Sequence, residues 1–229
     1  MFDLQGYFPS LMEGLLLTIS LSFFSLFFAM ILGICGALGK LSSYKILQKI
    51  MNGYTTIVRG IPELVLMLLL FFGGQMMINQ LAEMVGYEEY IDVNPYFAGI
   101  VTIGFIYGAY MAETFRGAIM SVSKGQLEAG RAYGMSGRQV FIRILFPQMI
   151  RHAIPGFGNN WLVLLKATAL VSVIGLDDIV RKAALAAGAT KMPFTFYLMV
   201  AVCYLVMTSI SVLLLSRLEK KYSVGVRTV

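Results

Sequence analysis

Long apolar stretches alternate with short polar segments along the whole chain. An α-helix needs about 20 predominantly apolar residues to cross the hydrocarbon core of a bilayer. Five stretches meet or approach that length, and we expect spans at about 14–39, 55–82, 93–117, 153–176 and 192–216. The first and the last of these stretches contain no charged residue. The pattern predicts an all-α integral membrane protein with five transmembrane helices.

The first apolar stretch is expected to stay in the protein as a helix. A cleaved secretory signal begins with basic residues and has a short apolar core of about 7–15 residues. Here Asp3 and Glu13 precede the stretch, no Lys or Arg does, and the apolar run is longer than such a core. We therefore interpret it as a retained span.

Composition and charge agree with a membrane protein and add its orientation. Of the 229 residues 58% are hydrophobic and only 13% are charged, whereas about a quarter are charged in soluble domains. Lys and Arg accumulate in cytoplasmic loops, and here they concentrate in 40–59, 116–151 and 217–227. The connection 83–92 is acidic, whereas 177–191 is mixed. This asymmetry predicts an N-terminus outside and a C-terminus inside, and it explains the +6 charge without a nucleic-acid partner.

The chain shows no motif for covalent chemistry. It has no phosphate-binding loop, no G-x-S-x-G turn and no H-E-x-x-H pair. Its single His and two Cys are not spaced as metal ligands, so we predict neither catalytic nor metal-binding residues. The longest polar segment, 118–152, is too short for an independent domain. If chemical energy drives this protein, another chain must supply it.

The polar segment contains "EAGRAYGMSGRQVFIRILFP" at 128–147. Its apolar residues after Gly137 recur at helical spacing, and Gly134 and Gly137 interrupt the helical pattern on either side of Ser136. The segment therefore predicts a short helix, a glycine-rich turn and a second helix that leads to Pro147. Such a helix can fit a groove on a partner, or it can lie among the lipid headgroups. The pattern alone leaves both alternatives open.

This segment resembles the cytoplasmic loop of permease subunits in ATP-binding-cassette importers. Their pattern is E-A-A, three residues, Gly, nine residues, Ile, one residue and Leu-Pro. The residues that match in spacing are Glu128, Ala129, Gly130, Gly134, Ile144, Phe146 and Pro147. Gly130 replaces Ala and Phe146 replaces Leu. The resemblance implies a coupling helix that docks on an ATPase, with Glu128, Ala129, Gly130 and Gly134 at the contact.

A resemblance to the polar amino acid branch of that family covers nearly the whole chain. It is carried by "RGIPELVLMLLLFFGG" at 59–74, "YGAYMAETFRGAI" at 107–119 and "GNNWLVLLKATALVSVIG" at 158–175, which are similar to histidine/lysine/arginine/ornithine permeases. It implies a multi-pass subunit in the bacterial plasma (inner) membrane. The implied partners are an extracytoplasmic binding protein, an ATPase dimer that holds ATP and Mg, and a second permease subunit, for which a paralogue is favoured over a second copy. This chain is expected to bind no cofactor.

Two carboxylates are candidates for the substrate pathway. Glu63 follows Pro62 within an apolar stretch, where it would complement a guanidinium or ammonium group. The alternative is an ion pair with Arg59, four residues earlier. Glu113 is the second candidate, and for it a structural pair with Arg116 is favoured.

The fourth stretch is the most polar of the five. Pro155, Gly156 and Gly158 weaken its first turns, and its polar residues Asn160, Lys166 and Thr168 are candidates for the pathway. Lys166 would hold the α-carboxylate of an amino acid or neutralise Glu63. Related permeases commonly carry Asp where this chain has Ala167, which makes Glu63 the expected carrier of cation selectivity.

A rival hypothesis is an ion-coupled secondary carrier or channel, in which Glu63, Glu113 and Lys166 form a relay. Such carriers often contain inverted repeats, and we detect none in this sequence. Transport in the absence of the ATPase would distinguish this hypothesis from the importer.

Overall fold

The computed structural model describes residues 4–222, so Asp3 lies outside the described residues. Five helical stretches are long and apolar enough to cross a membrane: α1 (Phe8–Lys40), α3 (Glu63–Met84), α4 (Pro95–Met120), the stretch Gly137–Ile174 that contains α7 (Phe146–Ala167), and α9 (Pro193–Tyr222). The all-α fold with five membrane helices predicted from hydropathy is therefore confirmed.

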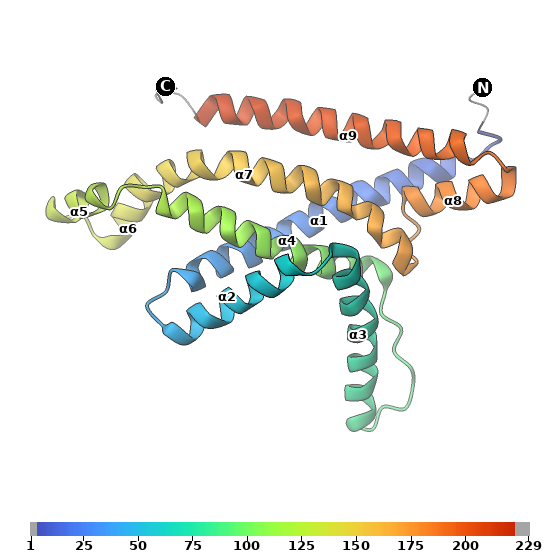
Figure 1. Ribbon diagram of the computed structural model, residues 1–229, viewed down its shortest axis with the longest axis horizontal. Helices are drawn as coiled ribbons and strands as arrows, with labels where there is room; N and C mark the ends of the chain where they lie inside the picture. The colour runs from blue at the N-terminus through green and yellow to red at the C-terminus, as the bar shows by residue number, and fades with distance from the viewer. Residues whose placement is uncertain (1–3, 223–229) are drawn as a thin grey trace.

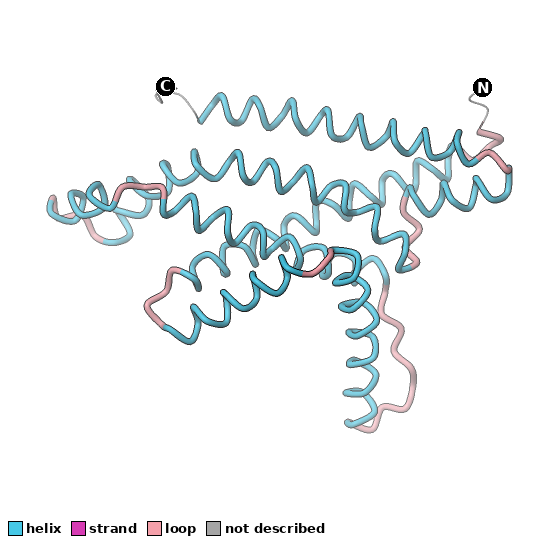
Figure 2. The backbone as a smooth tube through the Cα atoms, viewed as in Figure 1, coloured by secondary structure: helices cyan, strands magenta, loops and turns pink. Residues whose placement is uncertain are grey.

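Four of the long helices lie side by side, and one stands apart (Figures 1 and 2). α4 packs against α1 and α7, and α9 packs against α7. α3 projects away from these four and contacts mainly the neighbouring α4. The turn between α1 and α2 (Lys45–Gly60), α5 (Lys124–Ala132) and the end of α9 lie at one end of the molecule, whereas the start of α1 and α8 (Ile179–Thr190) lie at the other. The basic segments thus gather at one end.

Small residues set the close approach of α1 and α4. A methyl group added at Gly36 would lie 2.7 Å from the Cβ of Ala112, and one added at Gly33 would lie 2.5 Å from the Cβ of Met111. Glycines at a helix crossing allow the backbones to approach and make van der Waals contact, which is the main attraction between helices in lipid. These two glycines therefore determine how α4 is placed against α1.

The second predicted span, 55–82, is wrong at its start. α2 (Lys45–Gly60) ends before an extended Ile61, and α3 begins only at Glu63. Pro62 explains the break, because proline has no N–H for the helix ladder and disfavours helical geometry at the preceding residue. Residues 55–60 therefore belong to a separate helix, which buries Thr55 and Val58.

The fourth span is longer than predicted at its start, and the loop 118–152 is correspondingly shorter. α6 (Gly137–Val140) continues through a π-helical turn, Phe141–Leu145, into α7. Pro147 lies in the first turn of α7, where a missing N–H costs little. A 3₁₀ segment, Thr168–Ile174, ends the stretch. The non-helical part of the loop is thus confined to the ends of α5.

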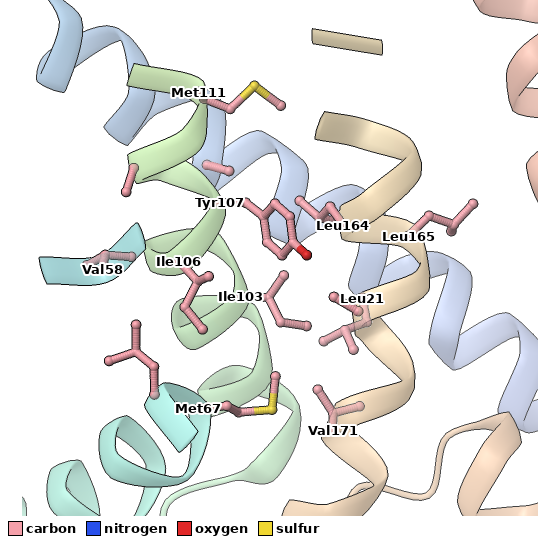
Figure 3. Close-up of a cluster of buried hydrophobic side chains, with 14 of the residues drawn as sticks. Leu21, Val58, Met67, Ile103, Ile106, Tyr107, Met111, Leu164, Leu165 and Val171 are labelled. Atoms are coloured by element: carbon pink, nitrogen blue, oxygen red, sulfur yellow. The ribbon is translucent and has the colours of Figure 1, made fainter. Parts of the chain in front are cut away.

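The main core lies where α1, α3, α4 and α7 meet (Figure 3). It is formed by buried side chains that include Leu21, Met67, Ile103, Ile106, Tyr107, Leu164 and Val171. A second cluster joins the start of α1 to α8 and α9, with Leu11, Ile179, Ala183 and Phe196 fully buried. The second cluster fixes the start of α1, and the main core fixes its middle and holds α4 against the start of α3.

Candidate functional site

One face of α4 carries polar side chains at three successive turns: Tyr107, Tyr110 and Glu113, here called the α4 stripe. A spacing of three residues places side chains on the same helix face. The ring centroids of the two tyrosines are 5.7 Å apart. Each member of the stripe meets a charged side chain from another element, namely Glu63 at Tyr107, Arg59 at Tyr110 and Lys40 at Glu113.

Glu113 forms the most heavily paired position of the stripe. Its carboxylate pairs with Lys40 and accepts two hydrogen bonds from Arg116, at 2.8 Å from Nη2 and 3.0 Å from Nε. Lys40 Nζ also donates to Thr55 Oγ1 at 2.7 Å. The Lys40 side chain is only 9% exposed. The expected pair with Arg116 is present, and Lys40 extends it into a network that joins α1, α2 and α4.

Glu63 has no cationic partner among residues 4–222. Its Oε2 accepts a hydrogen bond of 2.9 Å from the hydroxyl of Tyr107. The alternative ion pair with Arg59 does not form. That pair requires a continuous helix between residues i and i+4, and the backbone is extended at Ile61. The break at Ile61–Pro62 therefore separates the two charges.

Arg59 instead stacks on the α4 stripe. Its guanidinium carbon lies 5.4 Å from the centroid of the Tyr110 ring. Arg59, Tyr110, Lys40 and Glu113 line a polar hollow of about 460 Å³ between α1, α2 and α4, together with Thr55 and Thr56. The charged side chains that line the hollow are two cations and one carboxylate. The hollow therefore has an excess of positive charge next to the aromatic ring.

The polar residues of the fourth span do not meet at this hollow. Asn160 is 9% exposed and donates to Thr114 Oγ1 at 2.9 Å, which ties α7 to α4. Thr168 is fully buried, donates to the carbonyl of Leu165 at 2.7 Å and lies 3.1 Å from the hydroxyl of Tyr204. In this arrangement both side chains bond within the helix bundle and neither lines the hollow, so their predicted place in the pathway stays a prediction.

Lys166 has a different position. Its side chain is exposed, and within the described residues it forms no ion pair with Glu63 or any other carboxylate. The structure thus does not bring Lys166 to the stripe. A cation on the outside of a membrane helix is costly unless water or a partner chain covers it.

Three of the four predicted coupling residues are exposed on or next to α5. These are Glu128, Ala129 and Gly134, whereas Gly130 is buried. A methyl group at Gly130 would lie 2.5 Å from Cδ1 of Ile144. The Gly at this position thus allows Ile144 to pack directly against α5, and it leaves Glu128 and Ala129 exposed on the helix.

The turn after α5 is fixed by Gly134, which has a φ of +79°. The N–H of Met135 donates to the carbonyl of Gly130 at 3.1 Å, which closes the C-terminus of the helix. Ser136 and Gln139 then form a capping box at the start of α6. The predicted short helix and turn are present, and both ends of the turn are held by hydrogen bonds, but the second helix continues past Pro147 into α7.

Comparison with known proteins places this geometry in a family. Residues 25–224 match the binding-protein-dependent transport system inner membrane components. The chain belongs to this family. It is 50% identical over 98% of both chains to the histidine/lysine/arginine/ornithine transport system permease protein HisQ of Escherichia coli. It is 39% identical to the octopine transport system permease protein OccQ of Rhizobium radiobacter, over 92% of this chain and 89% of the relative.

A solved structure agrees with the sequence relatives. The permease superposes with a TM-score of 0.82 and 32% identity on a chain of an amino acid ABC transporter crystallised with histidines, covering 96% of this chain and 98% of that one. The resemblance drawn from the loop and the three longer segments is thereby confirmed. The protein is a permease component of an inner-membrane importer, and ATP hydrolysis in such systems belongs to a separate subunit.

Sequence reasoning missed Lys40, Tyr107 and Tyr110 as members of the site. A signal for the tyrosines was present, because "YGAYMAE" places them three and six residues before Glu113, on the same helix face. Lys40 directly follows the uncharged first span, but nothing in the sequence indicates that its ammonium turns inward to α4.

Proposed function

We propose that this permease is one transmembrane subunit of an importer for the basic amino acids arginine, lysine, ornithine and histidine, and that Glu63 receives the cationic side chain. One observation carries the proposal. Glu63 is partly buried, its carboxylate is oriented by the Tyr107 hydroxyl at 2.9 Å, and it pairs with no Lys or Arg of residues 4–222. A carboxylate without a cation at membrane depth is costly, and a cationic substrate would supply the missing charge.

The substrate names of the relatives support this choice of ligand. HisQ, at 50% identity, is named for histidine, lysine, arginine and ornithine transport, and the arginine transporter permease ArtQ of Haemophilus influenzae is 38% identical over 91% of both chains. A carboxylate such as Glu63 suits these substrates, because it accepts a cation and rejects an acidic side chain.

The importer requires a second permease subunit, either a paralogue or a second copy. Two features of the surface support this part of the proposal. Most apolar side chains of α3 are exposed, including Leu69, Phe72, Met76 and Leu81, and Lys166 lies on the outside of the α7 stretch. Lipid would suit the apolar side chains, but the Lys166 ammonium requires water or polar groups. A second permease subunit would cover both and complete the pathway.

The motor of the importer is an ATPase dimer that docks on α5, with Glu128 and Ala129 at the contact and Gly134 fixing the end of the helix. ATP and Mg belong to that dimer, and this chain is expected to bind no cofactor. An extracytoplasmic binding protein delivers the amino acid. The support is the family itself, whose members are components of binding-protein-dependent systems, together with the exposed position of α5 at the basic end of the molecule.

Arginine uptake tests the proposal in proteoliposomes that contain the full complex and the binding protein, with ATP hydrolysis measured in parallel. Loss of a charge-assisted hydrogen bond costs about 1.5–3 kcal/mol, so Glu63→Gln should lower uptake roughly tenfold to a hundredfold. Stimulated ATP hydrolysis should persist. Glu83→Gln is the matched control, because Glu83 is an exposed carboxylate at the other end of α3.

Two results would contradict the proposal in different ways. If Glu63→Gln leaves uptake unchanged, selectivity lies with the binding protein or the second permease subunit. If wild-type uptake proceeds without ATP, the protein acts as a secondary carrier or channel.

A further inference from the structure

Arg59 carries a positive charge that residues 4–222 do not neutralise. Among residues 4–222 no carboxylate lies within ion-pair distance of its guanidinium. Its one described contact is with the face of Tyr110, at 5.4 Å from the ring centroid. Stacking on an aromatic ring occupies the flat face of a guanidinium and leaves the N–H groups along its edge free to bind a planar anion. The side chain is exposed toward the polar hollow.

Arg59 and Glu63 lie on either side of the Ile61–Pro62 break and contact neighbouring rings of the α4 stripe. Glu63 accepts a hydrogen bond from Tyr107, Arg59 covers Tyr110, and the two rings are 5.7 Å apart. The site thus presents a carboxylate and a guanidinium that do not pair with each other, with aromatic surface between them. Interrupted membrane helices commonly form the substrate sites of transporters.

We infer that Arg59 binds the α-carboxylate of the amino acid whose cationic side chain reaches Glu63. The inference rests on the proposed function, since it adds the second contact of the same site. A guanidinium and a carboxylate match in a bidentate, charge-assisted geometry. The methylene chain of the substrate would lie along the Tyr110 ring, which is partly exposed, whereas the Tyr107 ring is buried and only orients Glu63.

The other cations near the pathway are less suitable for this role. Lys40 is 9% exposed and already bonded to Glu113 and Thr55. Arg116 donates two hydrogen bonds to Glu113. Lys166 is exposed on the α7 stretch and does not line the hollow. Arg59 is therefore the cation of the hollow whose hydrogen-bonding groups remain available, and it replaces Lys166 as the expected carboxylate ligand.

Direct binding to the permease–ATPase complex in lipid nanodiscs tests the inference, because the binding protein imposes its own selectivity and is left out. Tritiated arginine is the probe, and agmatine, which has the same cationic side chain but no carboxylate, is the competitor. Wild type should bind arginine more tightly than agmatine. Arg59→Gln should weaken arginine binding roughly tenfold to a hundredfold and leave the agmatine affinity unchanged. Arg59→Lys keeps the charge but loses the bidentate edge of the guanidinium, so its arginine affinity should lie between those of wild type and Arg59→Gln.

Arg217→Gln is the matched control, because it removes an exposed charge at the end of α9 and should change neither affinity. If Arg59→Gln weakens the binding of arginine and agmatine equally, or changes the binding of neither ligand, the inference is wrong. Arg59 would then only stabilise α2 against Tyr110. Glu63→Gln separates the two hypotheses, since it should weaken both ligands. If Glu63→Gln leaves the affinity for both ligands unchanged, the proposed cation contact is refuted, whatever the Arg59 variants show. Absence of arginine binding to wild type would overturn both.

Discussion

Asp178 provides a test of how burial of a charge affects this protein. It lies between the fourth and fifth spans, where its Oδ1 accepts the N–H of Arg181 at 2.9 Å and caps α8. The residue is 0% exposed, and its Oδ2 has no hydrogen-bond partner within the described part of the chain. Burial raises the pKa of the Asp178 carboxyl from 3.8 to about 6, against the opposing effect of the backbone hydrogen bonds.

The raised pKa fixes the direction of the pH effect. The folded protein holds the Asp178 proton up to higher pH than the unfolded chain, so the stability from protonation is fully present below pH 3.8 and is lost as pH rises through about 6. The two pKa values differ by about 2.2 (6 minus 3.8). At about 1.36 kcal/mol for each pH unit, ionisation of Asp178 costs roughly 3 kcal/mol at neutral pH.

Asp178→Asn removes this cost while keeping a good N-cap. We expect the variant to gain roughly 2 kcal/mol of stability relative to wild type as pH rises from 4.5 to 7.5, because about 1.5 pH units (6 minus 4.5) of the shift fall within this range. Asp178→Ala should show the same pH trend, offset at every pH by about 1 kcal/mol because it loses the cap. The measurement is the thermal unfolding midpoint of the detergent-solubilised complex across that pH range.

Comparison with Asp177→Asn controls for the loss of a carboxylate at the same turn, because the Asp177 side chain is 63% exposed. The reasoning is refuted if the difference between Asp178→Asn and wild type is the same at pH 5 and pH 7.5. That result would mean that water or a partner subunit solvates Oδ2 in the assembled importer.

Three further variants test the packing, the charge network and the loop. Gly36→Leu should lower the thermal unfolding midpoint, because even a methyl group would lie 2.7 Å from Ala112 Cβ and overpacking costs about 1–3 kcal/mol. Its control is Gly53→Ala, whose added methyl group would point into open space within α2. This control should instead raise the free energy of unfolding by up to about 1 kcal/mol. Glu113→Gln leaves the Lys40 ammonium without its carboxylate and should destabilise the folded protein by about 3 kcal/mol, seen as a lower thermal unfolding midpoint. Adding Lys40→Met to this variant should restore part of the lost midpoint. Gly134→Ala should cost about 1 kcal/mol at a φ of +79° and reduce the ATP hydrolysis that the loaded binding protein stimulates, measured in proteoliposomes.

Hydropathy predicted the membrane helices well because apolar length decides whether a helix can cross a bilayer, whatever it packs against. Averaging hydropathy over a window of residues does not reveal the break at Ile61–Pro62. A window across 55–82 remains apolar although the helix stops at Gly60. Pro62 was visible in the sequence, and it would have shown that the i, i+4 relation between Arg59 and Glu63 does not hold.

The direction of polar side chains was less predictable than the position of the spans. Thr168 was expected in the pathway because it is polar at membrane depth, but its hydroxyl donates to the Leu165 carbonyl within its own helix. Asn160 bonds Thr114 of α4 in the same way across two helices. Residue type shows that a polar group needs a partner, whereas only the packed structure shows whether that partner is internal or a substrate.

The position of α4 provides a route from ATP hydrolysis to the proposed substrate site. α4 ends at Met120 and α5 begins at Lys124, so three residues separate the proposed ATPase contact from the helix that carries Tyr107, Tyr110 and Glu113. The stripe contacts Glu63 of α3, Arg59 of α2 and Lys40 of α1. A displacement of α5 would therefore move α4 relative to the α2–α3 break and change the distance between the two proposed substrate contacts. We expect Gly36→Leu, which alters the α1–α4 contact without touching either site, to weaken this coupling as well as stability. Unchanged arginine uptake per ATP hydrolysed in that variant would argue that the force travels through α7 instead.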